Sequence, residues 1–139
     1  CWANMIQIGH QVADQLHPAA TAADPAECGG LLSGPTADTI TTATPVPNVA
    51  AEPQTRYELE PAAVLAALEA IDDADAVHVG FYHSHPTGPA RPSAVDRAAA
   101  AWPQTVHLIC APTAEPPLAA FRYIDDDTGF RPLTLSTVG

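Results

Sequence analysis

The amino-acid sequence predicts an α/β or α+β fold, with a mixed sheet flanked by helices. Two segments carry apolar residues at helical spacing, and short segments rich in β-branched and apolar residues lie around them. The chain has 139 residues, the size of one domain, and 47% of them are hydrophobic, which is enough for a sizeable core. No internal repeat or linker divides the sequence, so we expect a single domain over residues 1–139.

Helices are expected in three places. Residues 9–23 show the helical period despite Pro18, and residues 92–102 predict a short helix. The clearest helix is residues 61–75, because Pro61 suits a first helical position and four apolar residues share one face: Val64, Leu65, Leu68 and Ile71.

The strands are expected where β-branched and apolar residues alternate or gather between turn-forming residues. The expected segments are residues 5–8, 25–34, 38–50, 54–60, 76–86, 105–112, 117–125 and 129–138.

The charge and the apolar runs exclude some classes of partner. The formal net charge is −11, from 16 acidic residues against five arginines and no lysine, whereas nucleic-acid phosphates are bound by Lys and Arg. Apolar runs are broken well before the ~20 residues that a membrane span needs, and the N-terminus does not resemble a signal peptide. We therefore expect a soluble cytoplasmic protein that binds neither nucleic acid nor membrane. The missing lysine, the many aspartates and the Ala- and Pro-rich composition indicate a GC-rich genome, either of a salt-adapted organism or of another GC-rich bacterium.

The cysteines do not form a recognisable site. Cys1, Cys28 and Cys110 are odd in number, far apart and without a Cys-x-x-Cys pair, so neither a disulfide framework nor a thiolate zinc site is expected. Cys28 and Cys110 are interpreted as small buried apolar residues.

The segment "HVGFYHSHPTGPARPSAVD", residues 78–96, carries the chemistry. Alternate residues of a strand share a face, so His83 and His85 should lie on one face with Val79 and Phe81, and His78 on the other. A catalytic zinc takes three protein ligands, often His and Asp, and keeps the fourth position for water. Asp96 is the candidate for the third ligand.

A capping interpretation of the same residues stands beside the metal site. Ser93 is a good N-cap residue, and an Asp96 carboxylate in the first turn of a helix suits the free N–H groups there. A histidine in a strand is also more often packed or exposed than bound to metal. The stiff connection between His85 and Ser93 confines all these groups to one small volume, which favours the metal site.

The pattern His-x-His, seven residues, Ser, two residues, Asp resembles the signature of the JAMM (MPN+) metalloproteases. The upstream segment "AECGGLLSG" supplies Glu27 where that family has a glutamate. The resemblance covers nearly the whole chain and implies a short prokaryotic member, with a single JAMM domain and a mixed, mainly antiparallel sheet. It also implies roles: His83, His85 and Asp96 as ligands of one Zn²⁺ per chain, Glu27 as general base toward zinc-bound water, and Ser93 as hydrogen-bond donor to the tetrahedral intermediate.

The resemblance further implies a substrate. Hydrolytic relatives cut after the C-terminal Gly-Gly of ubiquitin or ubiquitin-like proteins, and short prokaryotic members resemble enzymes that deconjugate small archaeal modifiers or process ThiS- or MoaD-like sulfur carriers. By similarity, residues 42–60 would lie beside the Gly-Gly tail, and Phe81 or Tyr57 would line its channel.

Alternatives to this function are a metal-free MPN scaffold, a zinc hydrolase of a small molecule, and a DNA-repair relative of the RadC type. The oligomeric state is open. The other histidines are expected to lie away from the metal (His10, His17, His78 and His107), and Trp102 is expected to be a core or rim anchor.

Overall fold

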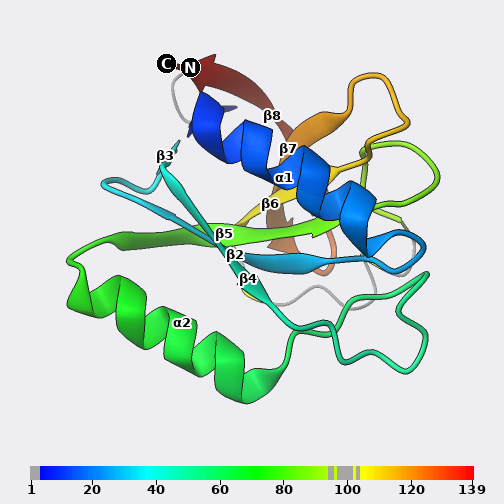
Figure 1. The fold of residues 1–139 in the computed structure, drawn as a ribbon. Helices are drawn as coiled ribbons and strands as arrows, with labels where there is room; N and C mark the ends of the chain where they lie inside the picture. Colours follow the sequence, from blue (N-terminus) through cyan, green and yellow to red (C-terminus); the bar gives the residue numbers. More distant parts are fainter. Residues whose placement is uncertain (1–3, 94–95, 97–101, 103) are drawn as a thin grey trace.

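The structure is a computed structural model that describes residues 4–93, 96, 102 and 104–139. Two helices are described, α1 (His10–Ala23) and α2 (Pro61–Asp73). Eight strands accompany them (Figure 1): β1 (Met5–Gly9), β2 (Gly29–Gly34), β3 (Thr39–Ile40), β4 (Thr42–Val46), β5 (Val77–Ser84), β6 (Val106–Cys110), β7 (Leu118–Asp125) and β8 (Gly129–Val138).

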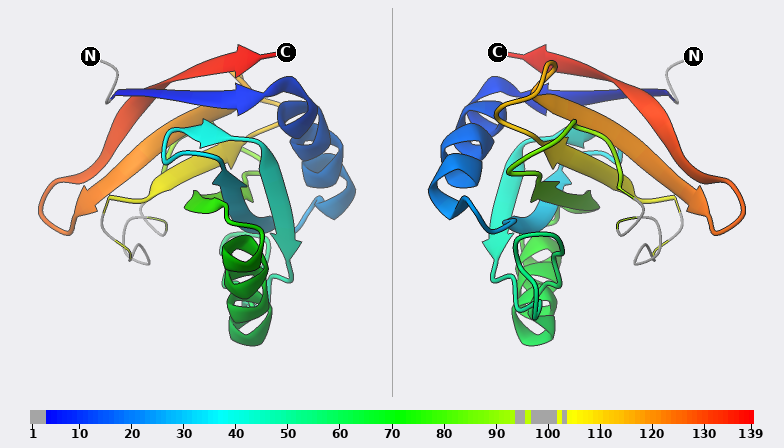
Figure 2. Two further views of the ribbon diagram at one scale, coloured as in Figure 1. Left: turned by 90° about the vertical axis from the view of Figure 1, so that its left-hand side faces the viewer. Right: turned by 90° about the vertical axis from the view of Figure 1, so that its right-hand side faces the viewer.

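The strands join in one mixed sheet of order β3-β1-β8-β7-β6-β5-β2-β4. Its pairs are antiparallel except β1–β3, β1–β8 and β5–β6, which are parallel. The sheet is strongly curved, and α1 and α2 lie on different sides of it (Figure 2). The predicted α+β class with a mixed, mainly antiparallel sheet is confirmed.

Each helix covers its own apolar core. α1 buries Val12, Leu16 and Ala20, one turn apart, against strand residues of the larger core cluster. α2 buries Ala67 and Ile71 over Leu31 and Phe81, which point to the opposite face. The Glu60 carboxylate caps the N-terminus of α2, because it accepts the N–H groups of Ala62 and Ala63.

The face of α2 differs in one residue from the prediction. Val64 and Leu68 pack against the core beside Ile71, but 58% of the Leu65 side chain is exposed. The buried stripe is centred on Ala67 and Ile71, so Leu65 falls on its flank.

Two strand predictions need correction. Residues 54–60 form a loop, joined only by an isolated bridge between Asn48 and Leu59. Backbone bonds from the Val49 N–H to the Glu58 carbonyl and from the Glu60 N–H to the Pro47 carbonyl form this bridge. The Asn48 side chain adds bonds to the backbone of Arg56 and Glu58. Residues 38–50 contain two strands, since the chain pairs first with β1 and then with β2.

A β-bulge changes which residues of β5 share a face. The register with β2 shifts between Gly80 and His78, which leaves Val79 outside the pairing. Val79 therefore packs with Tyr82 in the core under α1, and the His78 ring lies 5.0 Å from the Phe81 ring. The predicted alternation is wrong before Gly80, because one extra residue exchanges the two faces.

Most of the short helix predicted over residues 92–102 lies outside the described residues. Within the described part of the chain, no helix is long and apolar enough to cross a membrane. The cytoplasmic location and the single-domain span of residues 1–139 stay predictions.

Candidate metal centre

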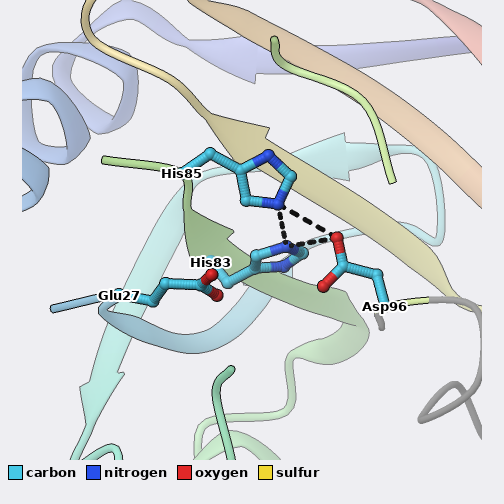
Figure 3. Close-up of side chains that lie close together, drawn as sticks. All are labelled: Glu27, His83, His85 and Asp96. Atoms are coloured by element: carbon cyan, nitrogen blue, oxygen red, sulfur yellow. Dashed lines mark hydrogen bonds and ion pairs between the residues drawn. The ribbon is translucent and has the colours of Figure 1, made fainter. Parts of the chain in front are cut away.

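Four buried side chains from three chain segments converge on one point. Each of Glu27, His83, His85 and Asp96 offers a ligand atom, and these four atoms all lie within 4.8 Å of one another. None of the four residues is more than 7% exposed. Figure 3 shows the two imidazoles and the Asp96 carboxylate facing one another, with the Glu27 carboxylate pointing toward His83.

Backbone pairing at the end of β5 places the histidines. His83 lies within the strand, and the His85 N–H donates to the Cys110 carbonyl at 2.8 Å, which extends the pairing beyond the last strand residue. Ser84, fully buried between them, donates its N–H to the Cys28 carbonyl at 2.9 Å and accepts the Cys28 N–H on its hydroxyl at 2.8 Å. Ser84 therefore has a structural role, because its two hydrogen bonds with Cys28 join the strand of the two histidines to the segment that contains Glu27.

The distances suit a tetrahedral metal ion. His83 Nε2 and His85 Nε2 are 3.1 Å apart, and Asp96 Oδ2 lies 3.2 and 3.0 Å from them. Ligands at the 2.0–2.1 Å bond lengths of zinc stand about 3.3 Å apart in a tetrahedron. Two imidazoles and one carboxylate are a ligand set that zinc commonly takes, so the residues present fit this ion.

The surroundings orient the donor atom of His85, whereas His83 Nδ1 is buried and has no protein partner among the described residues. The Pro89 carbonyl lies 2.9 Å from His85 Nδ1, which fixes the proton there and leaves the Nε2 lone pair toward the centre. Glu27 Oε1 is buried and has no protein partner among the described residues. A buried carboxylate oxygen of this kind is rare in proteins, and it is available to a water or substrate at the centre.

Ser93 and Asp96 form the predicted cap as well as part of the centre. The Asp96 N–H donates to Ser93 Oγ at 3.0 Å, and the Ser93 N–H donates to Asp96 Oδ2 at 2.9 Å. The capping and metal interpretations are therefore compatible, because the cap fixes the carboxylate that faces the histidines. Ser93 itself is exposed, and within the described residues its hydroxyl donates to no protein acceptor.

The electrostatics favour the metal-binding forms of Asp96 and His83, whereas burial of His85 is outweighed by its hydrogen bonds with Asp96 and Pro89, which raise its pKa. Burial opposes ionisation of Asp96, but its hydrogen bonds with His83 and His85 outweigh burial and hold its pKa well below the usual range. Burial also lowers the pKa of His83 and so favours the neutral imidazole. For Glu27, burial raises the pKa to about 7, with His85 opposing and Asp96 reinforcing the shift.

An open cavity of about 870 Å³ approaches the centre through the Tyr57 ring, and none of the four clustered residues lines it. Its walls are α2, the loop of residues 50–59, and the side chains of Phe81, Trp102 and His107. The Tyr57 ring lines this cavity and stacks on His83, with ring centroids 4.2 Å apart and planes 17° apart. The expectation that Tyr57 and Phe81 line a channel agrees with this cavity, and the loop forms the part of residues 42–60 that reaches it.

Other residues lie near the centre without joining the cluster. Trp102 is 48% exposed and packs edge-on against Phe81, at the rim of the cavity as expected. His107 is buried in the cavity wall beside Phe81 and Phe130, and burial lowers its pKa to about 4. The place of His107 in this wall was not predicted from the sequence. Asn48, which bonds to the Glu27 carbonyl, was not predicted either, because it carries no sequence signal beyond an Asn after proline.

Comparison with known proteins agrees with this arrangement. Residues 9–124 match the family described as prokaryotic homologs of the JAB domain. A desampylase from Haloferax volcanii is 47% identical over 113 residues, which cover 81% of this chain and 78% of the relative. A probable TtuB-protein conjugate cleaving protease from Thermus thermophilus is 45% identical over 58 residues, 42% of this chain and 39% of the relative.

Solved structures share the fold. A protein from Desulfitobacterium hafniense, determined in solution, superimposes with a TM-score of 0.83 at 27% identity and covers 96% of this chain and 93% of its own. A JAB1/MPN domain protein from Archaeoglobus fulgidus has a TM-score of 0.60 at 20% identity, with 94% and 97% covered, and supports the fold alone.

The chain belongs to the prokaryotic JAB family. This confirms the JAMM/MPN resemblance and the prediction that the protein is an enzyme of that family.

Proposed function

We propose that the protein is a zinc-dependent isopeptidase or peptidase that cleaves after the C-terminal Gly-Gly of a ubiquitin-like modifier or sulfur-carrier protein. The observation that carries the proposal is the convergence of Glu27, His83, His85 and Asp96 beside an open cavity. The names of the two relatives, a desampylase and a probable conjugate-cleaving protease, support this substrate class.

In this proposal the four clustered residues divide the chemistry. His83, His85 and Asp96 hold one zinc ion, which supplies a Lewis acid that polarises the scissile carbonyl and acidifies water. Glu27 accepts the proton of the attacking water and delivers it to the leaving amine, the role of a positioned carboxylate in general acid–base catalysis. Ser93 donates its hydroxyl proton to the oxyanion that develops on the carbonyl.

The cavity is the proposed site of the modifier tail. An extended tail can run along the loop of residues 50–59 toward Tyr57 and His83. Two glycines suit the last positions, because a backbone without side chains can approach the stacked rings closely. The partner is then the modifier or carrier itself, and the proposal includes a cytoplasmic location.

One experiment tests the activity and the metal together. Zinc is quantified in the purified protein, and the same sample is given a ubiquitin-like protein joined through its Gly-Gly tail to a lysine peptide, with and without a chelator, at low and high salt. Zinc near one per chain with chelator-sensitive cleavage after the second glycine is expected.

Other outcomes contradict the proposal in different ways. Zinc without cleavage of the lysine conjugate, of a linear fusion or of a carrier–amino-acid bond would indicate a small-molecule hydrolase. A folded protein with neither zinc nor cleavage would indicate a scaffold.

A further inference from the structure

The Asn48 carboxamide uses its full hydrogen-bonding capacity inside the protein. Its Nδ2 donates to the Glu27 carbonyl at 2.9 Å and to the Arg56 carbonyl at 3.0 Å. Its Oδ1 accepts the N–H groups of Ala50 at 3.1 Å and Glu58 at 2.9 Å. An amide side chain has two donor protons and two acceptor lone pairs, so all four positions are satisfied. The side chain thereby links segments that are distant in sequence.

One end of this link holds the backbone of Glu27. Glu27 lies before β2 begins, so the sheet does not fix it directly. Its N–H donates to the Pro53 carbonyl at 2.7 Å, and its carbonyl accepts from Asn48. Both backbone polar groups of the proposed base are therefore held by the loop that follows β4.

The other end holds Tyr57. The Arg56 carbonyl and the Glu58 N–H, both bound by Asn48, belong to the two peptide groups that flank Tyr57. The Tyr57 ring covers His83 face to face and lines the cavity. Fixing both peptides fixes the position from which that ring reaches the histidine.

We propose that Asn48 is a positioning residue, which sets the places of Glu27 and of Tyr57 against His83 at the point where the cavity meets the metal centre. Within the described residues, all four hydrogen bonds of the Asn48 side chain go to backbone groups and none to the clustered side chains, so it acts through these two residues. The inference rests on the hydrolytic function proposed above.

The test uses Asn48→Asp, which keeps the side-chain shape and the acceptor but loses both donor bonds. The new carboxylate oxygen also faces two carbonyl oxygens, those of Glu27 and Arg56. Substitution of a residue that supports the ligands of a metal site typically lowers metal affinity or activity about 10- to 100-fold. We expect kcat to fall about 10- to 100-fold, KM to change far less, and the zinc content to stay near that of the wild type.

A matched control separates positioning from a general loss of stability. Gln15 on α1 donates its amide to the Ala43 carbonyl at 3.2 Å, on the other side of the sheet from the cavity. Gln15→Glu makes the same amide-to-carboxylate change there with the loss of one donor bond, and it should leave kcat unaltered. Both variants are assayed well below their own melting temperatures, so that kcat reports on folded protein. Amide hydrogen exchange at Glu27 should accelerate in Asn48→Asp and not in Gln15→Glu.

A double-mutant cycle completes the test. If Asn48 acts partly through Tyr57, the double variant of Asn48→Asp and Tyr57→Leu should lose less kcat/KM than the product of the two single fold-losses; independent effects would give that product. A double variant that reaches the full product, or a kcat of Asn48→Asp within twofold of the wild type, would overturn the inference. Failure of both Asn48→Asp and Asn48→Ala to fold would also overturn it, since the role would then be folding. An inactive wild type would instead refute the proposed function.

Discussion

Glu27 is the residue whose role can be separated most cleanly from metal binding. Its carboxylate is buried, one oxygen has no protein partner among the described residues, and its pKa is raised to about 7. Glu27→Gln keeps the volume but removes the base, so kcat should fall about 100- to 10,000-fold while zinc stays bound. Turnover and zinc content of the same preparations check this, with Glu69→Gln on exposed α2 surface as the control. Full turnover of Glu27→Gln would exclude it as the base.

Substitutions of Asp96 and of Ser93 should differ in their effect on zinc content, measured in the same assays. Asp96→Asn removes the only carboxylate among the three proposed ligands, so zinc content and activity should both be lost. Ser93→Ala should keep zinc and lose about 100- to 1000-fold in kcat, the usual effect of removing one oxyanion donor. It also loses the cap to the Asp96 N–H, which contributes about 1 kcal/mol to stability. Zinc retained by Asp96→Asn would remove Asp96 from the ligand set.

At the scale of elements, the sequence predicted what depends on period and spacing. The helices α1 and α2 follow from apolar residues at helical intervals, and the convergence of His83, His85 and Asp96 follows from alternation and a short stiff connection. The bulge at Val79 could not be predicted, because it depends on how β5 aligns with a strand almost 50 residues earlier. The same holds for the loop of residues 54–60, which an isolated backbone bridge and the Asn48 side chain hold instead of an extended ladder.

His107, which β6 places in the cavity wall, makes the stability of the fold depend on pH. Burial lowers the pKa of His107 from 6.5 to about 4, so between these values the unfolded chain binds a proton that the folded chain does not. Stability from the neutral imidazole is thus present above about pH 6.5 and is lost as the pH falls toward 4. The loss should reach roughly 1 to 3 kcal/mol, since one pKa unit corresponds to about 1.4 kcal/mol.

Denaturant unfolding between pH 4 and 7.5 checks this, with His107→Phe as the comparison. The variant keeps an aromatic ring beside Phe81 and Phe130 but cannot titrate. The free energy of unfolding should therefore fall less steeply with acid in His107→Phe than in the wild type. Parallel curves for the two proteins would contradict a buried neutral histidine.

For the whole molecule, the dominant electrostatic fact is a net charge of −11 on 139 residues. Five arginines face 16 acidic residues, and an exposed ion pair such as Arg56 with Glu52 contributes little. Self-repulsion of this kind destabilises the compact state and is screened by salt, since the Debye length falls from about 10 Å at 0.1 M to about 3 Å at 1 M.

The melting temperature should therefore rise between 0.05 and 1 M NaCl, and the slope should decrease when exposed acidic residues such as Asp127, in the turn between β7 and β8, are replaced by Asn. Thermal unfolding at fixed pH and fixed zinc content measures both effects. Sucrose at matched osmolality is the control, because it stabilises by exclusion from the surface without screening charge. If the melting temperature were the same across this salt range, self-repulsion would not limit the stability of the fold, and the acidic composition would need a different physical reason.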